Sequence, residues 1–290
     1  MLKEQEFIEI IKKQIGTEYI GDDCAYLKDL GIVVSQDSLV EGVHFRLDWC
    51  TPCQLGYKAV TVNISDILAS GAVPKYIAIA LSLPKDITEE FVEEFYKGAK
   101  SALRGAKIVG GDITGADKVY ISITAIGVAA NHRISSRSHA KEGDKVIVAG
   151  DFGKSSAGLN ELIKGGNDLE LIRAHLEPVL DEDFASEISG QINTDYAMMD
   201  ASDGLADALF KIAEASNLSI VSDYIEGMFG AEDYKIVAAV PEEFLANLST
   251  YKVIGEVADK QDYILKIGDK KFYKYDELGL FDHFGDKYYE

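Results

Sequence analysis

Apolar residues recur along the chain with the periods of helices and strands. Apolar side chains at positions 7, 8, 11 and 15 share one helical face, and Gly16 follows them, so a helix is expected to end there. Residues 31–35 have the apolar character of a buried strand. Thr51 followed by Pro52 is a typical helix start, and the apolar pattern after it predicts a helix lasting to Gly71.

The same patterns continue through the rest of the chain. Further strands are expected at residues 76–83, 118–129 and 145–149, and further helices from 88 to near 105, through 162 and from 203 to 216. Strands and helices alternate, but without the regular βαβ spacing of a doubly wound sheet. The fold class is therefore predicted as α/β, of the α+β type.

A polar stretch at residues 131–144 interrupts the alternation. Chain length favours two domains over one, and polar connections are typical places for a domain boundary. We therefore expect an N-terminal domain at residues 1–132 and a C-terminal α/β domain at residues 133–290.

The charge balance limits the possible partners. The 290 residues include 49 acidic and 29 basic side chains, a formal net charge of −20. Such a chain has no long-range attraction for a nucleic-acid backbone, so no nucleic-acid partner is expected. There is no run of eighteen apolar residues, and the N-terminal segment lacks the features of a signal peptide. We expect a cytoplasmic protein that makes no membrane contact.

Six acidic positions differ from the acids on helix surfaces, because each lies beside a glycine or at the end of an apolar element. They are Asp23 (with Asp22 beside it), Asp37, Asp66, Asp112, Asp200 and Asp203. Any one of them is explained by a cap or turn, and Asp203 would cap the helix that follows Gly204. Together they offer the hard oxygen ligands that suit Mg²⁺ and, through it, substrate phosphates. The set predicts a site for phosphoryl transfer.

Two other strings carry competing interpretations. Residues 49–53 read WCTPC, so Cys50 and Cys53 could form a thiol–disulfide site, or could be two reduced thiols at a helix start. Residues 150–155 read GDFGKS, which ends like a P-loop but has two residues between its glycines where that motif has four, so a tight turn is expected. A non-catalytic metal-binding protein would leave the glycines and Arg137 unexplained.

Seven segments, in order along the chain, resemble the thiamine-monophosphate kinase family. They are residues 21–25 (GDDCA), 35–45 (SQDSLVEGVHF), 58–66 (KAVTVNISD), 69–74 (ASGAVP), 110–114 (GGDIT), 137–144 (RSHAKEGD) and 200–205 (DASDGL). The DSLVEGVHF string is the most specific, because relatives such as aminoimidazole ribonucleotide synthetase share only the acidic and glycine elements.

The resemblance implies ATP-dependent phosphorylation of thiamine monophosphate to thiamine diphosphate by direct in-line transfer, with Mg²⁺ ions held by aspartates. It implies a two-domain subunit of the aminoimidazole ribonucleotide synthetase superfamily that forms a homodimer through its N-terminal domain. The metal-binding residues it implies are Asp23, Ser35, Asp37, Asp66, Asp112, Asp200 and Asp203. The residues it implies at ATP are Gly111, Asp112, Arg137 and Ser202, and those at the thiamine phosphate are His44 and Glu232. No side chain is expected to act as a general base, because the acceptor is already a phosphate oxygen.

A few positions depart from the family pattern. Gln36 stands where the family usually has threonine, and Glu177 stands where a basic residue is typical. Residues 222–232 form a shorter segment than usual, and residues 280–284 resemble the family ending without its aromatic substrate contact. The alternative function is therefore a related ATP-using synthetase of the same superfamily, similar to selenophosphate or aminoimidazole ribonucleotide synthetase. The EGVHF string favours the kinase.

Overall fold

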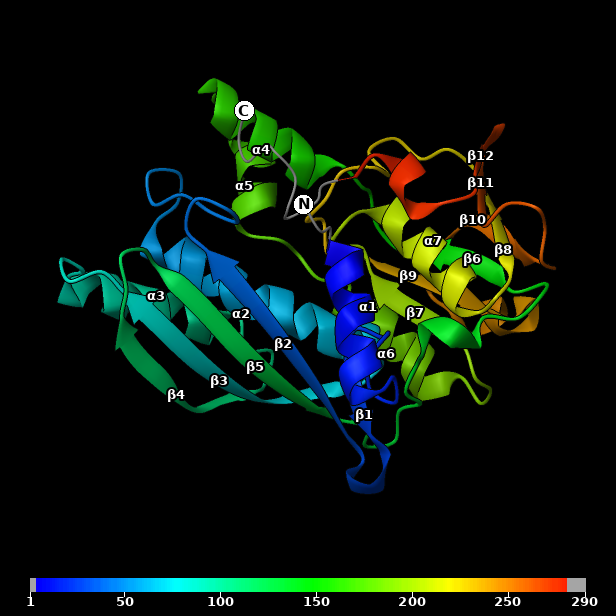
Figure 1. Ribbon diagram of the computed structural model, residues 1–290, viewed down its shortest axis with the longest axis horizontal. Coiled ribbons are helices and arrows are strands. Elements are labelled where there is room, and N and C mark those ends of the chain that lie inside the picture. Colours follow the sequence, from blue (N-terminus) through cyan, green and yellow to red (C-terminus); the bar gives the residue numbers. More distant parts are fainter. Residues whose placement is uncertain (1–3, 281–290) are drawn as a thin grey trace.

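Residues 4–280, the part of the chain that the computed structural model describes, build two β-sheets that share one long helix, α2 (Pro52–Ala69) (Figure 1). Helix α2 packs against strands of the first sheet and also against an edge strand of the second sheet. The two sheets are therefore joined by a common core rather than by the connecting chain alone.

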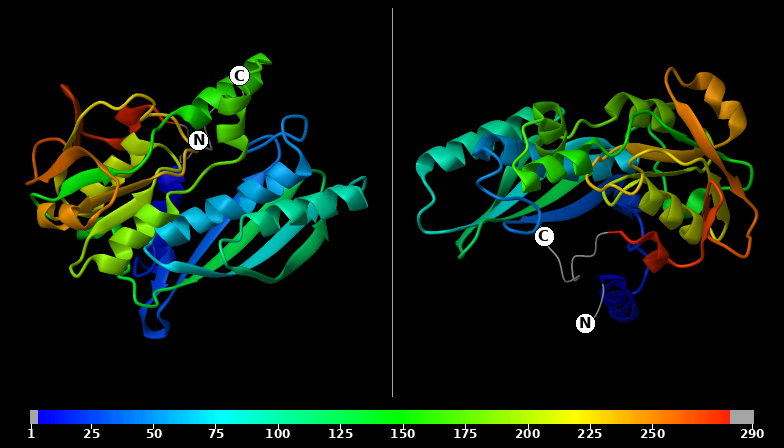
Figure 2. Two further views of the ribbon diagram at one scale, coloured as in Figure 1. Left: turned by 180° about the vertical axis from the view of Figure 1, so that it is seen from behind. Right: turned by 90° about the horizontal axis from the view of Figure 1, so that it is seen from above.

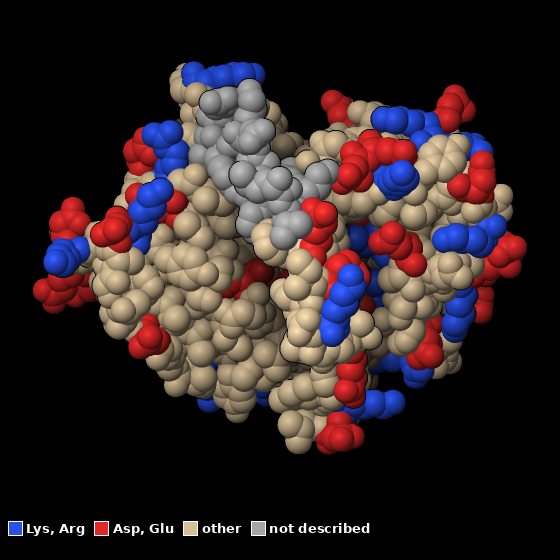
Figure 3. Space-filling model, viewed as in Figure 1, with Lys and Arg blue, Asp and Glu red and all other residues tan. Residues whose placement is uncertain are grey.

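The first sheet has the strand order β1-β2-β5-β3-β4, and only β3 and β4 run parallel. Its strands are β1 (Ala25–Leu27), β2 (Ile32–Val40), β3 (Val73–Leu83), β4 (Lys107–Gly115) and β5 (Tyr120–Val128). Helices α2 and α3 (Glu89–Ser101) cover one face of the sheet, which is turned toward the viewer in the left view of Figure 2. The opposite face, toward the viewer in Figure 3, carries few charged side chains.

The pleat of β2 sends alternate side chains to opposite faces of this sheet. Val33 is fully buried against the helices, and Ser35 and Asp37 follow it on that side. Gln36 lies on the opposite face, where its Nε2 donates to Ser122 Oγ of β5 at 2.7 Å. The family departure at position 36 therefore faces away from Ser35 and Asp37.

The second sheet has the order β12-β11-β8-β10-β6-β9-β7. Its strands are β6 (Lys145–Val148), β7 (Ala197–Asp200), β8 (Ser219–Ser222), β9 (Ile236–Val240), β10 (Lys252–Ala258), β11 (Leu265–Ile267) and β12 (Lys270–Phe272). The remaining helices are α1 (Glu4–Ile15), α4 (Lys154–Lys164), α5 (Leu169–Leu176), α6 (Glu182–Gln191) and α7 (Leu205–Ala215). Helix α7 packs on one face of the sheet, and α6 and α2 pack on the other.

Helix α2 begins as the sequence predicts and is buried on nearly all sides. Thr51 and Gln54 form a capping box, and Pro52 occupies the first turn, where its missing N–H costs nothing. Gly56 allows α3 to come close, because a Cβ there would meet the carbonyl oxygen of Phe95 at 1.9 Å. Burial all round explains why this helix has a weak amphipathic pattern.

The predicted α/β fold is confirmed, and most predicted elements are present. Helix α1 ends at Ile15, before Gly16, and Thr88 caps α3 as expected. The interpretation of Asp203 as a helix cap is wrong. The N-cap of α7 is Gly204, and no side chain caps this helix. The sequence pattern misses β4, whose glycines and exposed residues lack strand alternation.

Two expectations stay predictions. The boundary at residue 132 falls in the connection between β5 and β6, and the division into two domains remains to be tested. Of the C-terminal segment at residues 280–284, positions 281–284 lie outside the described residues.

Within residues 4–280, none of the helices combines the length and apolar character needed to cross a bilayer.

Candidate active site

Three of the singled-out aspartates form one carboxylate cluster. Asp23 precedes β1, Asp66 lies in α2 and Asp200 ends β7, yet one oxygen of each lies within 4.8 Å of the others. They are separated by up to 177 positions in sequence and come from both sheets and the helix between them. We call Asp23, Asp66 and Asp200 the carboxylate cluster.

Hydroxyl groups hold two members of the cluster in place. Ser35 of β2 donates from Oγ to Asp66, and Ser65, the neighbour of Asp66 on α2, donates to Asp200. Asp37 also lies on this side of β2, and its charge raises the pKa of Asp66. The backbone N–H of Asp37 donates to the buried side chain of Asn63 at 3.2 Å.

The cluster carries more negative charge than the protein around it offsets. Burial raises the pKa of Asp66 well above its usual range, and the charges of neighbouring aspartates add to the rise. Burial also raises the pKa of Asp200, with a further contribution from Asp23. Asp200 Oδ1 is buried with no hydrogen-bond partner. Buried carboxylates in this state fit a bound cation, which would supply the missing positive charge.

Arg137 lies at the edge of the carboxylate cluster. Its Nη2 donates to Asp23 Oδ1 at 2.7 Å, and its backbone N–H donates to Asp22 Oδ1 at the same distance. The carbonyl of Arg137 accepts from Ser216 Oγ at 2.8 Å, and its Nε is buried without a hydrogen-bond partner. A fixed guanidinium with an unused donor is suited to binding an anionic oxygen.

Glu232 lies in a second group, which we call the Glu232 clamp: Glu232, Lys58 and His175. Glu232 Oε2 lies 3.2 Å from Lys58 Nζ of α2 and 3.3 Å from His175 Nδ1 of α5. Burial works to raise the pKa of Glu232, but the nearby basic groups, with Lys58 the largest contributor among them, together outweigh it, so the pKa lies below its usual range. Here the acid has its positive partner built into the fold.

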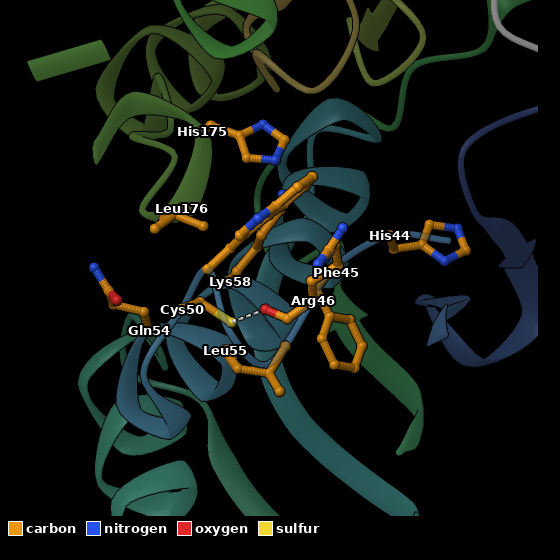
Figure 4. A pocket seen from close by; sticks show the side chains of 10 residues that line it. His44, Phe45, Arg46, Cys50, Gln54, Leu55, Lys58, His175 and Leu176 are labelled. Carbon is orange, nitrogen blue, oxygen red and sulfur yellow. Dashed lines mark hydrogen bonds between the residues drawn. The ribbon is translucent and has the colours of Figure 1, made fainter. Parts of the chain in front are cut away.

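His44 shares a pocket with the clamp. Its Nδ1 accepts the backbone N–H of Val40 at 3.0 Å, which fixes the orientation of the ring. Figure 4 shows His44, Lys58 and His175 around this pocket, which lies between the loop after β2, the start of α2 and the end of α5. Of the two substrate-side residues implied by the sequence, His44 lines this pocket, and Glu232 is linked to it through Lys58 and His175.

Ser202 and Asp203 lie on the loop between β7 and α7. The Ser202 carbonyl accepts the backbone N–H of Glu232 at 2.6 Å. Asp203 is partly exposed and lies 3.2 Å from Lys211 Nζ, which in turn lies 2.9 Å from the fully buried Asp207. Asp203 is therefore not part of the carboxylate cluster in this structure.

Gly111 and Asp112 lie elsewhere. Asp112 is exposed on β4, in register with Ala80 of β3, and so on the sheet face opposite to Asp37. Three strand spacings, about 14 Å, separate β4 from β2 across the sheet. A Cβ at Gly111 would meet the carbonyl oxygen of Ile79 at 1.7 Å, so glycine is required by the close approach of β3. One subunit does not bring Asp112 to the carboxylate cluster.

The cysteines give no support to a redox site. Cys50 and Cys53 are free thiols at the start of α2, and Cys50 Sγ donates to the Arg46 carbonyl at 3.4 Å. Burial raises the pKa of Cys50 to about 11, which leaves almost no reactive thiolate at neutral pH. The GDFGKS turn is also explained internally, because the backbone N–H groups of Gly153 and Ser155 bind the carboxylate of Asp233.

Sequence reasoning missed several polar side chains that build these groups. Lys58, Asn63 and Ser65 lie on α2, and His175 lies on α5. The available signal was a set of polar residues within the otherwise apolar string KAVTVNISD. A helix that is apolar except for a few polar positions places those positions where they must be paired.

Comparison with known proteins gives a consistent family. Residues 21–129 match the family model described as AIR synthase related protein, N-terminal domain. Thiamine-monophosphate kinase of Aquifex aeolicus is 34% identical over 272 residues, covering 83% of this chain and 87% of the relative. The solved structure of AaThiL complexed with AMPPCP and TMP superposes with a TM-score of 0.87 at 31% identity, covering 98% of this chain and 97% of that one.

A more distant structure shares the fold alone. Hydrogenase maturation protein HypE in complex with ATP is 20% identical, with a TM-score of 0.63 over 88% of this chain and 87% of that one. The kinase matches are separated from this relative by their higher sequence identity. The chain belongs to the thiamine-monophosphate kinase family.

Proposed function

We propose that the protein transfers the γ-phosphoryl group of ATP directly to thiamine monophosphate, giving thiamine diphosphate. The observation that carries the proposal is the buried carboxylate cluster beside Arg137, in a chain similar to a kinase whose structure holds AMPPCP and TMP. Two anions must approach each other in this reaction, so a site with concentrated cation-binding acids suits it.

The residues that would hold Mg²⁺ are Asp23, Asp66 and Asp200, with Ser35 and Asp37 beside them. The raised pKa values of the buried acids and the unpaired Asp200 Oδ1 support this assignment, since a cation would relieve both. Bound Mg²⁺ would offset the repulsion between phosphate oxygens. Asp203, on the loop before α7, completes the proposed set within one subunit; its partner Lys211 lies on α7.

The chain's own donors would hold the two substrates in line. Arg137 supplies a guanidinium for a nucleotide phosphate, and Ser202 lies on the loop before α7. Because His44 Nδ1 accepts a backbone N–H, the neutral ring carries its proton on Nε2, which can donate to the thiamine phosphate. Glu232 would contact the thiamine part. The attacking atom is already an anionic oxygen, so positioning replaces general-base catalysis.

We also propose that two copies pair through the open face of the first sheet. That face carries few charged side chains, and the edge strand β4 is exposed along nearly all of its length. Asp112 lies on this face, with Gly111 next to it in β4, and both would serve the site of the partner. Mixing Asp112→Asn subunits with Asp66→Asn subunits should then restore activity at a fraction of the sites, as measured by turnover of the mixture. No recovery in mixed dimers would contradict this arrangement.

The test of the proposed function is a product assay. Purified protein is incubated with ATP, Mg²⁺ and thiamine monophosphate, and thiamine diphosphate and ADP are quantified by chromatography. We expect equal amounts of the two products, with no turnover in EDTA. ATP binding without thiamine diphosphate, together with turnover of another acceptor from a panel of phosphates and selenide, would favour the related synthetases.

A further inference from the structure

We propose that His175 is a positioning residue that orients Glu232, so that one carboxylate oxygen is committed to the protein and the other faces the thiamine part of the substrate. This inference rests on the proposed function for its substrate, but the arrangement itself can be tested without turnover. His175 lies outside every motif on which the sequence-based site was built.

The backbone at Glu232 is already constrained. Its φ of +66° is unusual for a residue with a side chain, and such conformations persist where the surroundings enforce them. The Ser202 carbonyl accepts its N–H, and the next residue, Asp233, binds the N–H groups of Gly153 and Ser155 at the start of α4. The main chain thus brings the Glu232 side chain to Lys58 and His175, two residues that line the same pocket as His44.

Both side-chain contacts of the clamp use the same oxygen. Lys58 Nζ lies 3.2 Å and His175 Nδ1 lies 3.3 Å from Oε2. The side chains of Lys58 and His175 are both almost fully buried. Among the described residues, no hydrogen bond or ion pair reaches Glu232 Oε1. Oε1 is therefore the oxygen that can accept an amino N–H or face the positive ring of a thiamine compound.

The ring of His175 must carry its proton on Nδ1 for this arrangement. Burial lowers the pKa of His175 to about 4, so at neutral pH the ring has one N–H. Nδ1 lies 3.0 Å from Ser155 Oγ as well as 3.3 Å from the carboxylate of Glu232. A lone pair on Nδ1 would face a carboxylate oxygen and be repelled by it, whereas an N–H there donates to Ser155 Oγ and is attracted by the nearby carboxylate of Glu232. The competing arrangement has Ser155 donating to Nδ1 and the proton on Nε2.

Substitution of His175 can be interpreted because α5 is attached to α2 by other contacts. Gln54 Nε2 donates to Glu177 Oε1 at 3.0 Å, and Tyr57 Oη donates to the Pro178 carbonyl at 3.2 Å. The backbone at position 175 is therefore held independently of the imidazole. Glu177, the acid at a position where the family usually has a basic residue, takes part in this attachment.

The first experiment compares two variants with different donors. Asn places an N–H donor where Nδ1 stands, and Leu removes it, so His175→Leu should raise the KM for thiamine monophosphate by about 10- to 100-fold. The KM for ATP should not change, and His175→Asn should stay within about threefold of wild type. The matched control is His132→Leu, because His132 Nδ1 also lies 2.8 Å from a serine hydroxyl, that of Ser189, but away from the clamp. Equal effects of His175→Asn and His175→Leu, or equal changes in both KM values, would overturn the proposal.

The second experiment asks whether His175 acts through Glu232. In a Glu232→Ala background, His175→Leu should change the KM for thiamine monophosphate by no more than about twofold, because the group it orients is gone. Full additivity of the two substitutions would show that His175 acts by another route, and the proposal would be wrong.

The third experiment does not depend on the substrate. Nitrogen-15 spectra of histidine-labelled protein at neutral pH report which ring nitrogen is protonated, and the signals of His175 are identified by their loss in His175→Asn. We expect the Nδ1–H form; the Nε2–H form would overturn the clamp even in an active kinase. A wild-type protein with the Nδ1–H form and no thiamine diphosphate product would instead remove the proposed function.

Discussion

The carboxylate cluster and the Glu232 clamp are both buried groups built around acids, and they differ in how the charge is balanced. In the cluster, three aspartates lie together and burial raises their pKa values, with one oxygen of Asp200 left unpaired. In the clamp, Lys58 lies 3.2 Å from Glu232 and lowers its pKa. The cluster fits an added cation, whereas the clamp has its positive partner within the protein.

This difference separates two uses of a buried acid. A group that is complete in the protein alone contributes to stability and holds a fixed geometry, as expected of a substrate contact. A group that is left unbalanced costs stability in the metal-free protein and recovers it on binding. Substitutions that remove one negative charge should therefore act in opposite directions on the two groups.

The largest effect is expected from Asp200→Asn. Loss of a metal-binding oxygen should lower turnover by about a thousandfold, because bound Mg²⁺ contributes several kcal/mol to such transfers. The same change should raise the melting temperature of the metal-free protein, since it removes an acid whose ionisation is disfavoured by burial and by the neighbouring carboxylates. The first effect is measured as turnover with Mg²⁺, and the second as thermal unfolding in EDTA. Wild-type turnover would show that the cluster does not hold the metal.

The opposite effect on stability is expected from Glu232→Gln. This change leaves the ammonium group of Lys58, 3% exposed, without its carboxylate, so it should lower the free energy of unfolding by about 1–3 kcal/mol. The free energy of unfolding is measured by urea unfolding in EDTA, and Asp200→Asn is measured under the same conditions for comparison. If both variants shift stability in the same direction, the contrast between the two groups is wrong.

A smaller, pH-dependent effect is expected from His175→Asn. The native pKa of His175 is about 4, below the ordinary value of 6.5, so between these values the unfolded chain binds a proton that the native protein does not. Stability from this residue is complete above pH 6.5 and falls as the pH is lowered. From pH 7 to about pH 5 the wild type should lose about 2 kcal/mol more than the variant. Urea unfolding of both proteins at the two pH values checks this, and an equal loss in the two would contradict the prediction.

The smallest effect is expected from the double substitution of Cys50 and Cys53 to serine. The thiol of Cys50 is buried with a raised pKa, and serine keeps a donor for the Arg46 carbonyl. Kinase turnover should stay within about twofold of wild type, since surface and half-buried changes of this kind have small effects. A loss as large as that of Asp200→Asn would return the redox interpretation to consideration.

The sequence determined the helices and strands whose signals are local. The Thr51-Pro52 start of α2, the end of α1 before Gly16 and the alternation in β5 follow from capping, backbone conformation and side-chain period. It also identified the aspartates as a set, because acids beside glycines and apolar ends are unusual. The resemblance in the DSLVEGVHF string gave the family, which the comparisons confirm.

The tertiary structure decided which of these residues lie together. Asp23, Asp66 and Asp200 meet because β1, α2 and β7 converge, while the pleat and strand order place Asp112 on the other face of the sheet. The clamp could not be read from the sequence, because Lys58, His175 and Glu232 are brought together only when α2 packs against α5. Local pattern fixes an element and its faces, but the balance of charge in a buried group depends on contacts between elements far apart in the chain.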